Sequence, residues 1–240
     1  MSVDLRVDWC EHKAARFACN HWHYSRTMPV SKSAKLGVWE NGVFVGAIVF
    51  ALGASANLGT PYGLMGSECC ELVRVALAVH LSPVSQMLSK AISLIRLQSS
   101  GLRLIVSFAD TFHSHHGGIY QATNWTYTGT TSPSAMVLLS DGSLVDPRRF
   151  NGHGNRNAKW GHQPVKPIPP GAKLIRTPPK YRYLYPLDRA MRKQIAPLAK
   201  PYPKRKTREQ GVEGDTVGDQ PTETGSIPVV RFDATGASVS

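Results

Sequence analysis

The residues best suited to chemistry in this sequence lie in one short stretch between positions 109 and 120. Asp110 can act as a general base or orient a neighbouring histidine, and three histidines follow it within six residues. Gly117 and Gly118 let a ligand approach the backbone closely, and Tyr120 carries a phenol that can donate a proton or stack on a base. The stretch is therefore predicted to form a catalytic or ligand-binding loop.

Two groups of histidines also allow a metal-binding interpretation. The first is His21 with His23, and the second is the histidine group of the loop: His113, His115 and His116. Imidazole and carboxylate groups are common ligands of transition metals, and Asp110 could complete such a site. Among these residues, His113 and His116 are taken as the metal candidates. Because no fixed ligand motif such as HExxH is present, the alternative is a set of polar loop residues that form hydrogen bonds or contact phosphate.

The elements that must position this loop are predicted from periodicity and turn residues. Apolar residues 104–108 predict a buried strand that ends directly at the loop. The other expected elements, in chain order, are a helix over 8–18, a hairpin of strands 36–39 and 43–52 turning at Asn41-Gly42, a strand over 68–79, a helix capped by Ser82 with Pro83 as its first residue, a short helix over 119–123, strands 125–130 and 135–139, and a helix over 188–195. A helix between two sequential strands usually makes a parallel crossover, so we expect an α/β (α+β) fold with a mixed central sheet flanked by helices.

The net charge of +12 is concentrated in the C-terminal half of the chain. Residues 148–208 contain 17 Lys and Arg and a single acid, Asp188. Aromatic residues are interleaved with these charges: Phe150, Trp160, Tyr181, Tyr183, Tyr185 and Tyr202. Basic groups neutralise phosphates and aromatic faces stack on unpaired bases, so the segment predicts a nucleic-acid partner. The predicted DNA-binding residues are Arg148, Arg149, Lys180, Arg182, Lys204 and Arg205. A solvated basic linker is the alternative.

Composition excludes several other classes of protein. No uncharged apolar run approaches the roughly 20 residues that span a bilayer, and the charged N-terminus lacks the apolar core of a signal peptide. The four cysteines show no CxxC spacing and are expected to be free thiols in a reducing cytoplasm. We predict a catalytic core over 1–146, a basic extension packed on it over 147–206 and a disordered tail over 207–240.

Several ordered motifs resemble one protein family. They are His23-Tyr24-Ser25-Arg26, Glu71-Leu72-Val73-Arg74, Ser107-Phe108-Ala109-Asp110, the run from His116 to Ala122, and Lys180-Tyr181-Arg182-Tyr183. Together they resemble the Mom proteins of bacteriophages, over roughly residues 10–190. The segment 120–125 is also similar to the tyrosine, helix and strand region of the GNAT acyltransferase fold. The resemblance implies an enzyme of the host cytoplasm that converts adenine in phage DNA to its N6-carbamoylmethyl (acetamido) form and so hides restriction sites.

Carried over by motif, the resemblance implies an active site formed by His23, Tyr24, Asp110 and Tyr120. Ser85 or Ser89, on the long helix, would contribute to binding a cofactor. The donor of the transferred group is left open: acyl-CoA and another two-carbon compound are the alternatives. Iron or another divalent metal is a further expected cofactor. A base inside a duplex cannot reach a pocket, so double-stranded DNA with a flipped adenine is the expected partner, and no membrane is expected. The oligomeric state is left open, a homodimer included.

One departure from the GNAT pattern concerns coenzyme A. GNAT enzymes bind its pyrophosphate through a Gly-rich turn before the long helix, but residues 80–86 contain no glycine. Simple acyl transfer would also leave a carbonyl on the amine, whereas the product of the Mom family is attached through a methylene. Two other classes stay open: a metal-dependent nuclease that uses Asp110 and the loop histidines, and a DNA-binding protein without catalytic activity.

Overall fold

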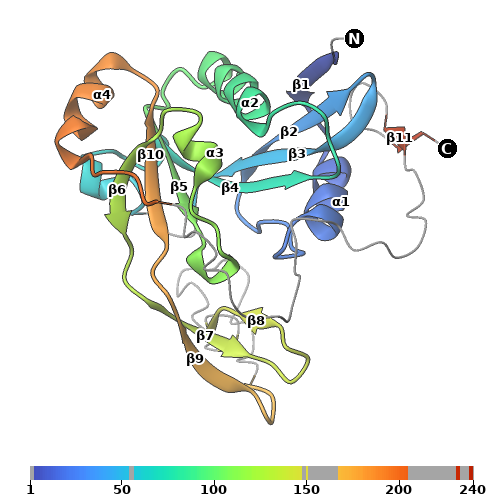
Figure 1. Ribbon diagram of the computed structural model, residues 1–240, viewed down its shortest axis with the longest axis vertical. Coiled ribbons are helices and arrows are strands. Elements are labelled where there is room, and N and C mark those ends of the chain that lie inside the picture. Colours follow the sequence, from blue (N-terminus) through green and yellow to red (C-terminus); the bar gives the residue numbers. More distant parts are fainter. Residues whose placement is uncertain are drawn as a thin grey trace, which may run out of the picture.

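A seven-stranded sheet forms the centre of the protein (Figure 1). The computed structural model describes residues 3–53, 57–147, 150, 167–204, 231–232 and 238–239. The strands lie in the order β1 (Leu5–Trp9), β2 (Ser33–Glu40), β3 (Val43–Ala51), β4 (Cys69–Leu77), β5 (Leu104–Ala109), β10 (Tyr181–Pro186) and β6 (Thr126–Thr130). Within this sheet β4 and β5 are parallel and the other neighbours are antiparallel. The prediction of a mixed sheet flanked by helices is confirmed.

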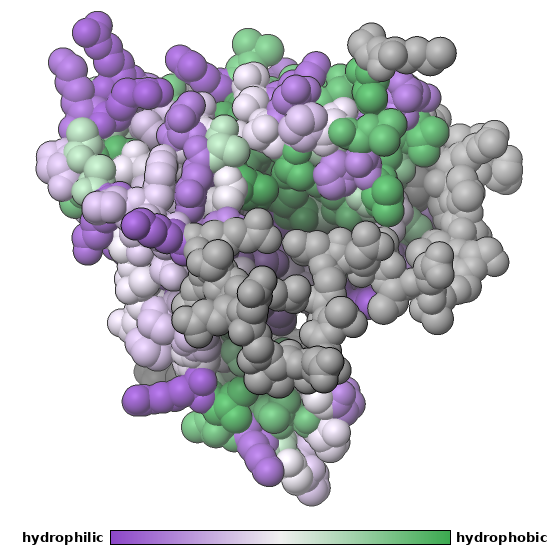
Figure 2. Space-filling model, viewed as in Figure 1, coloured by the Kyte–Doolittle hydropathy of each residue, from purple (hydrophilic) through white to green (hydrophobic). Residues whose placement is uncertain are grey.

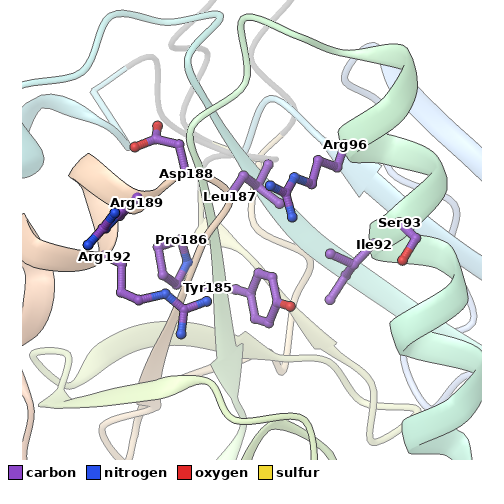
Figure 3. Close-up of a pocket in the computed structure, with 9 residues that line it drawn as sticks. All are labelled: Ile92, Ser93, Arg96, Tyr185, Pro186, Leu187, Asp188, Arg189 and Arg192. Atoms are coloured by element: carbon purple, nitrogen blue, oxygen red, sulfur yellow. The ribbon is translucent and has the colours of Figure 1, made fainter.

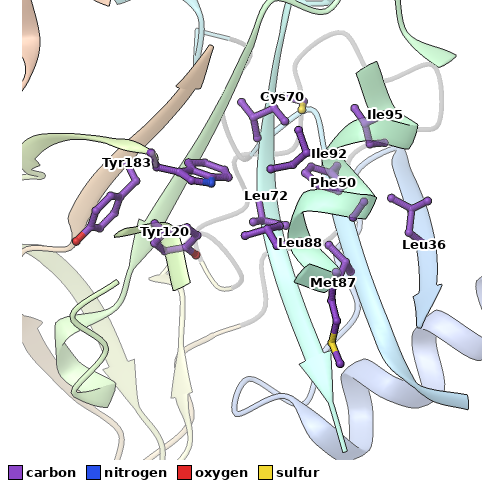
Figure 4. Packing of buried hydrophobic residues seen from close by; sticks show 14 of the residues in the cluster. Leu36, Phe50, Cys70, Leu72, Met87, Leu88, Ile92, Ile95, Tyr120 and Tyr183 are labelled. Carbon is purple, nitrogen blue, oxygen red and sulfur yellow. The ribbon is translucent and has the colours of Figure 1, made fainter. Parts of the chain in front are cut away.

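Helices cover both faces of the sheet because apolar side chains of the strands point alternately to each face. Ala47 and Val49 of β3 pack with α1 (His12–Trp22), whereas Ile48 and Phe50 pack with the apolar side of α2 (Val84–Gln98). Figure 4 shows Met87, Leu88, Ile92 and Ile95 of α2 in this second cluster. The third cluster lies under α4 (Arg189–Ile195) and includes Leu104 and Val106 of β5. The parallel crossover from β4 through α2 to β5 was predicted correctly.

The N-terminal prediction of a helix over 8–18 was wrong in its bounds. Residues 5–9 form the edge strand β1, in which Leu5 pairs with Glu40 and Trp9 with Leu36, and the helix begins only at His12. Burial of Ala14, Ala15, Ala18 and Cys19 fixes the packed side of α1. Pairing with a distant strand therefore outweighs the local helical spacing.

The predicted hairpin and the start of α2 meet at a buried carboxylate. Asn41-Gly42 joins β2 to β3 as predicted, with positive φ at both residues. The N-cap prediction for Ser82 was wrong, because α2 begins at Val84 and its capping position, Pro83, makes no side-chain cap bond. Instead, Glu40 accepts hydrogen bonds from the backbone N–H groups of Leu81 at 2.7 Å and Ser82 at 2.6 Å. The carboxylate of Glu40 therefore satisfies two backbone N–H donors in the loop before α2.

The strand β10 is the largest departure from the expected fold. No strand was predicted beyond residue 146, yet residues 181–186 lie between β5 and β6 in the main sheet. One interior strand of the main sheet therefore comes from the segment that was assigned to the basic extension. Tyr183 is fully buried and its ring lies 4.9 Å from that of Tyr120, while the Tyr185 ring lies 5.4 Å from Trp125. Tyr183 is therefore a packing residue, and its interpretation as a base-stacking residue was wrong.

A smaller three-stranded sheet extends from the end of the main one (Figure 1). It consists of β8 (Leu144–Val145), β7 (Ser134–Leu138) and β9 (Lys173–Thr177). The remaining elements are η1 (Thr60–Tyr62), η2 (Thr111–His113), α3 (Gly118–Gln121), η4 (Ala196–Leu198), β11 (Arg231–Phe232) and β12 (Ser238–Val239). None of the described helices is long and apolar enough to span a bilayer. All four cysteines are free thiols, as predicted.

Candidate functional site

The parallel strands β4 and β5 separate beside the predicted loop. Their pairing ends at Glu71 and Val106, although both strands continue. Ser107 bridges the separation: its hydroxyl donates to the carbonyl of Leu72 at 2.8 Å, and a second hydrogen bond of 2.8 Å joins it to the hydroxyl of Tyr120. Burial raises the pKa of Tyr120 to about 12, so its phenol keeps its proton at neutral pH. Tyr120 and Ser107 therefore form a buried hydrogen-bonded pair beside the loop.

Asp110 stands directly after β5 and is only 8% exposed. Its Oδ1 accepts the backbone N–H of Phe112 at 3.1 Å and so caps η2, while Oδ2 lies 2.7 Å from Nζ of Lys180. The hydroxyl of Thr111 donates to the carbonyl of Pro179 at 2.7 Å. This hydrogen bond connects the loop to the segment that carries Lys180. Asp110 is therefore held in place by one backbone N–H group and one ammonium group.

A run of aromatic rings extends from the interior to the surface beside Asp110. The rings of His23 and Tyr24 have centroids 4.2 Å apart, as do those of Tyr24 and His113, and His113 lies 5.3 Å from Phe112. His115 contacts the edge of Tyr24 at 5.3 Å. His23 is buried, whereas Tyr24 and Phe112 are 46% and 45% exposed. The run therefore ends in an exposed aromatic face.

The environment of His23 keeps its imidazole neutral. Burial, followed by the positive charge of Arg74, lowers its pKa from 6.5 to about 3. The backbone N–H of Ser25 donates to Nδ1 at 3.1 Å, so the ring proton resides on Nε2. Burial and the charge of Asp110 also raise the pKa of Tyr24. At neutral pH both rings are uncharged.

We expect His23 to make stability depend on acid pH. The unfolded chain protonates this histidine near pH 6.5 and the folded chain only near pH 3, so the unfolded state binds more protons in that window. Stability should fall as the pH drops from about 6.5 towards 3. In urea titrations at pH 7 and pH 4.5, His23→Gln should lose less stability on acidification than the wild type does. His21→Gln, which replaces an exposed histidine in the last turn of α1, should behave as wild type. An NMR titration of His23 near pH 6.5 would contradict the assignment.

Three residues that contribute to the site were not assigned to it from the sequence. Ser107 is the one polar residue in the six-residue apolar strand β5. A polar residue in such a strand could have been recognised in the sequence as a candidate site residue. Arg74 donates from Nη1 to the carbonyl of Val73 at 2.7 Å, and from Nε to that of Thr27 at 3.1 Å, beside His23 and Tyr24. Lys180 was assigned to DNA contact, but the structure pairs it with Asp110.

A second layer of contacts holds the loop in place. The hydroxyl of Tyr183 donates to the carbonyl of His116 at 2.7 Å, and the side-chain amide of Gln121 donates to the Tyr183 hydroxyl at 3.2 Å. Gly117 has a φ of +84°, and a Cβ at this position would overlap the Tyr183 ring. Only glycine fits here, because both the backbone conformation and the space exclude a side chain.

The described histidines do not form a ligand set for a metal ion. No three His, Cys, Asp or Glu side chains converge suitably within the described part of the chain. His113 stacks on Tyr24, whereas the ring of His116 lies against Gly118, and His21 bonds to the carbonyl of Phe17 at 2.8 Å. His21 and His23 therefore have separate partners, and the predicted pair His113 and His116 has no third ligand among the described residues.

The predicted cofactor-binding serines lie on α2. Ser89 lines an open pocket with Val7, Lys90, Ser93 and Leu94, on the side of α2 that packs near β1. Ser85 is half-buried in the first turn of the helix. The loop before α2 does not suit a pyrophosphate, because Glu40 occupies two of its N–H donors and brings a negative charge. Burial alone would raise the pKa of Glu40, but hydrogen bonds from Ser82 and Leu81 outweigh burial and lower it.

The predicted DNA-binding residues fall into three groups. Arg148, Arg149 and Arg205 lie outside the described residues. Arg182 donates to the hydroxyl of Thr128 at 3.0 Å and Lys180 pairs with Asp110, so both have partners within the protein. Lys204 is exposed.

Fold and site together define an α+β protein in which an aspartate, a neutral histidine and two phenols lie beside a basic segment. Such a set suits proton transfer at a polyanionic substrate. The model of the Mom protein family matches residues 4–204. The chain therefore belongs to the Mom family, a phage family of DNA-modifying proteins, as the motifs predicted. No curated protein matches the chain.

Proposed function

We propose that this protein is a transferase that converts adenine in double-stranded DNA to N6-carbamoylmethyladenine and so protects phage DNA from host restriction. The observation that carries the proposal is the position of Asp110, an almost buried carboxylate paired with Lys180 beside Tyr24. Family membership supplies the class of substrate, DNA. A GNAT-like ancestry of the core is part of the same proposal, supported by the parallel crossover from β4 to β5 and the tyrosine of α3.

The proposed roles follow from protonation states. The exocyclic amine of adenine is a poor nucleophile and must lose a proton as its new bond to carbon forms. Asp110 accepts that proton, and Lys180, whose Nζ lies 2.7 Å from its carboxylate, keeps the side chain in position. Tyr120, which is protonated at neutral pH, gives a proton to the leaving group of the donor. His23, neutral with its proton on Nε2, orients the adenine through a hydrogen bond.

Access of the base is proposed to follow the run of aromatic rings. A duplex hides N6 of adenine, so the target base has to leave the stack. The exposed faces of Tyr24 and Phe112 lie within the ring run next to Asp110 and offer a surface on which an extruded base can stack. The donor is proposed to be a two-carbon compound; acyl-CoA would have to bind away from the loop before α2, because Glu40 fills the donors there. A divalent metal such as iron remains a proposal with no step assigned to it.

The proposal is tested by producing the chain in bacteria and analysing the nucleosides of digested host DNA by mass spectrometry. The expected result is a deoxyadenosine derivative heavier by one carbamoylmethyl group in place of a hydrogen, in DNA whose strands are intact. Cleaved DNA that depends on a divalent metal would indicate a nuclease. Salt-dependent DNA binding with unmodified adenine, at good expression, would indicate a binding protein.

Lys204 provides a test of the DNA contact. Its side chain is exposed, so Lys204→Gln should leave folding unchanged and remove one phosphate contact. Affinity should fall to a similar degree on unrelated duplexes, and the salt slope should decrease by about 1. Lys32→Gln, an exposed lysine in the loop before β2, is the matched control. Equal slopes for the two variants would remove Lys204 from the interface.

A further inference from the structure

A pocket of about 220 Å³ lies at the opposite end of β10 from Asp110 (Figure 3). Tyr181, at the start of β10, pairs with Ala109 beside the candidate site, whereas Pro186, at its end, pairs with Leu104. The pocket is lined by residues of α2, of the end of β10, of α4 and of the segment between β10 and α4, and these include Arg96, Tyr185, Asp188, Arg189 and Arg192. None of these residues has a role in the proposed reaction.

Three arginines give the pocket its chemical character. Arg96 reaches it from α2, while Arg189 and Arg192 come from α4 on the other side of the strand (Figure 3). All three are exposed residues, and hydrophilic side chains gather over α4 in Figure 2. Guanidinium groups bind phosphate oxygens through paired N–H donors, and the hydroxyl of Tyr185 adds a neutral donor.

The acid in the lining does not offset these charges, because it is already used within the protein. Asp188 accepts from Nε of Arg103 at 2.8 Å through Oδ2, and from the backbone N–H of Met191 at 2.7 Å through Oδ1. The hydrogen bond from Arg103 lowers the pKa of Asp188 and keeps it ionised. The ion pair with Arg103 balances the carboxylate, so the charge that faces the pocket comes from Arg96, Arg189 and Arg192.

Size limits what the pocket can hold. Sites for drug-sized ligands enclose about 300–1,000 Å³, so a smaller volume suits a single compact group such as a phosphate. β10 spans about 17 Å at roughly 3.3 Å per residue, so the pocket is separated from the candidate site by about the length of this strand.

We propose that this pocket is a phosphate-binding site formed by Arg96, Arg189 and Arg192. The phosphate comes either from the backbone of the bound DNA or from a phosphorylated small molecule. The DNA source rests on the proposed function, whereas the assignment of phosphate chemistry does not.

The test uses the full chain and compares Arg192→Gln and Arg96→Gln with Arg16→Gln, an exposed arginine on α1 that makes the same change of charge elsewhere. Affinity for a short fluorescent duplex is measured over a salt series, and stabilisation by inorganic pyrophosphate is measured by thermal shift at constant ionic strength. For a DNA phosphate, each pocket variant should bind several-fold more weakly and lose about one unit of salt slope relative to Arg16→Gln. For a small molecule, duplex binding should match the control and the pyrophosphate shift should be lost.

Pocket variants that match Arg16→Gln in both measurements would overturn the phosphate site. Circular dichroism and the thermal midpoint without ligand confirm that each variant folds. Neither readout needs catalysis, so the outcome is independent of the modification of adenine. If the wild type makes no modified adenine while the pocket variants still lose affinity, only the proposed function fails.

Discussion

Asp110→Asn is expected to lower the yield of modified adenine by about 10²–10⁴-fold, the range that a positioned general base contributes. Asparagine keeps an oxygen that can accept the N–H of Phe112, so the cap of η2 survives the change. It cannot accept a proton at neutral pH and it loses the ion pair with Lys180. The product is measured by nucleoside mass spectrometry of DNA from cells that produce equal amounts of each protein.

Asp141→Asn is the matched control for this change. Asp141 also caps a turn through Oδ1, which accepts the N–H of Ser143 at 2.8 Å, but it is exposed in the loop between β7 and β8. It should leave the product unchanged. DNA affinity of Asp110→Asn should stay near that of the wild type. Loss of the folded state in Asp110→Asn would make the aspartate structural, and full activity would remove it from catalysis.

Gly117→Ala is expected to destabilise the protein by about 3 kcal/mol or more, since alanine suffers both a left-handed backbone and an overlap with a buried ring. The Tyr183 ring cannot move aside easily, because it is fully buried and packs against Tyr120. The free energy of unfolding is measured by urea titration, together with the yield of modified adenine. Both should fall, because Gly117 leads directly into α3 and Tyr120.

Gly142→Ala separates the two contributions to that cost. Gly142 has a φ of +81°, close to the +84° of Gly117, but a Cβ there meets no atom within 4 Å. Its expected cost is about 1 kcal/mol, from the backbone conformation alone. The difference between the two variants measures the clash with Tyr183. Equal costs would show that the Tyr183 ring yields to the added methyl group.

Local signals predicted the elements that hold the site. The Asn41-Gly42 turn, the helical spacing along α2 and the apolar run before Asp110 each act through near neighbours, and all three elements are present. The position of Asp110 after β5 was predicted for the same reason, since the end of an apolar strand is visible in the sequence.

Contacts between distant segments explain what the sequence did not predict. β10 is enclosed by β5 and β6, from which it is separated by long connections, and the tyrosines that pack it were interpreted as DNA contacts because they alternate with basic residues. The pairing of Lys180 with Asp110 depends on that insertion, as does the contact of Tyr183 with the loop. β1 is comparable: residues 5–9 form a strand because β2 offers an edge. Pairings of this kind depend on the assembled sheet rather than on local spacing.

The most direct test of the central claim is the mass of deoxyadenosine from DNA exposed to the wild-type protein and to Asp110→Asn. The proposed reaction predicts a carbamoylmethyl derivative in intact DNA with the wild type, and its near absence with the variant at equal expression and equal DNA affinity. Unmodified adenine with the well-expressed wild-type protein would contradict the proposed reaction. The same derivative at equal yield from both proteins would contradict the role of Asp110.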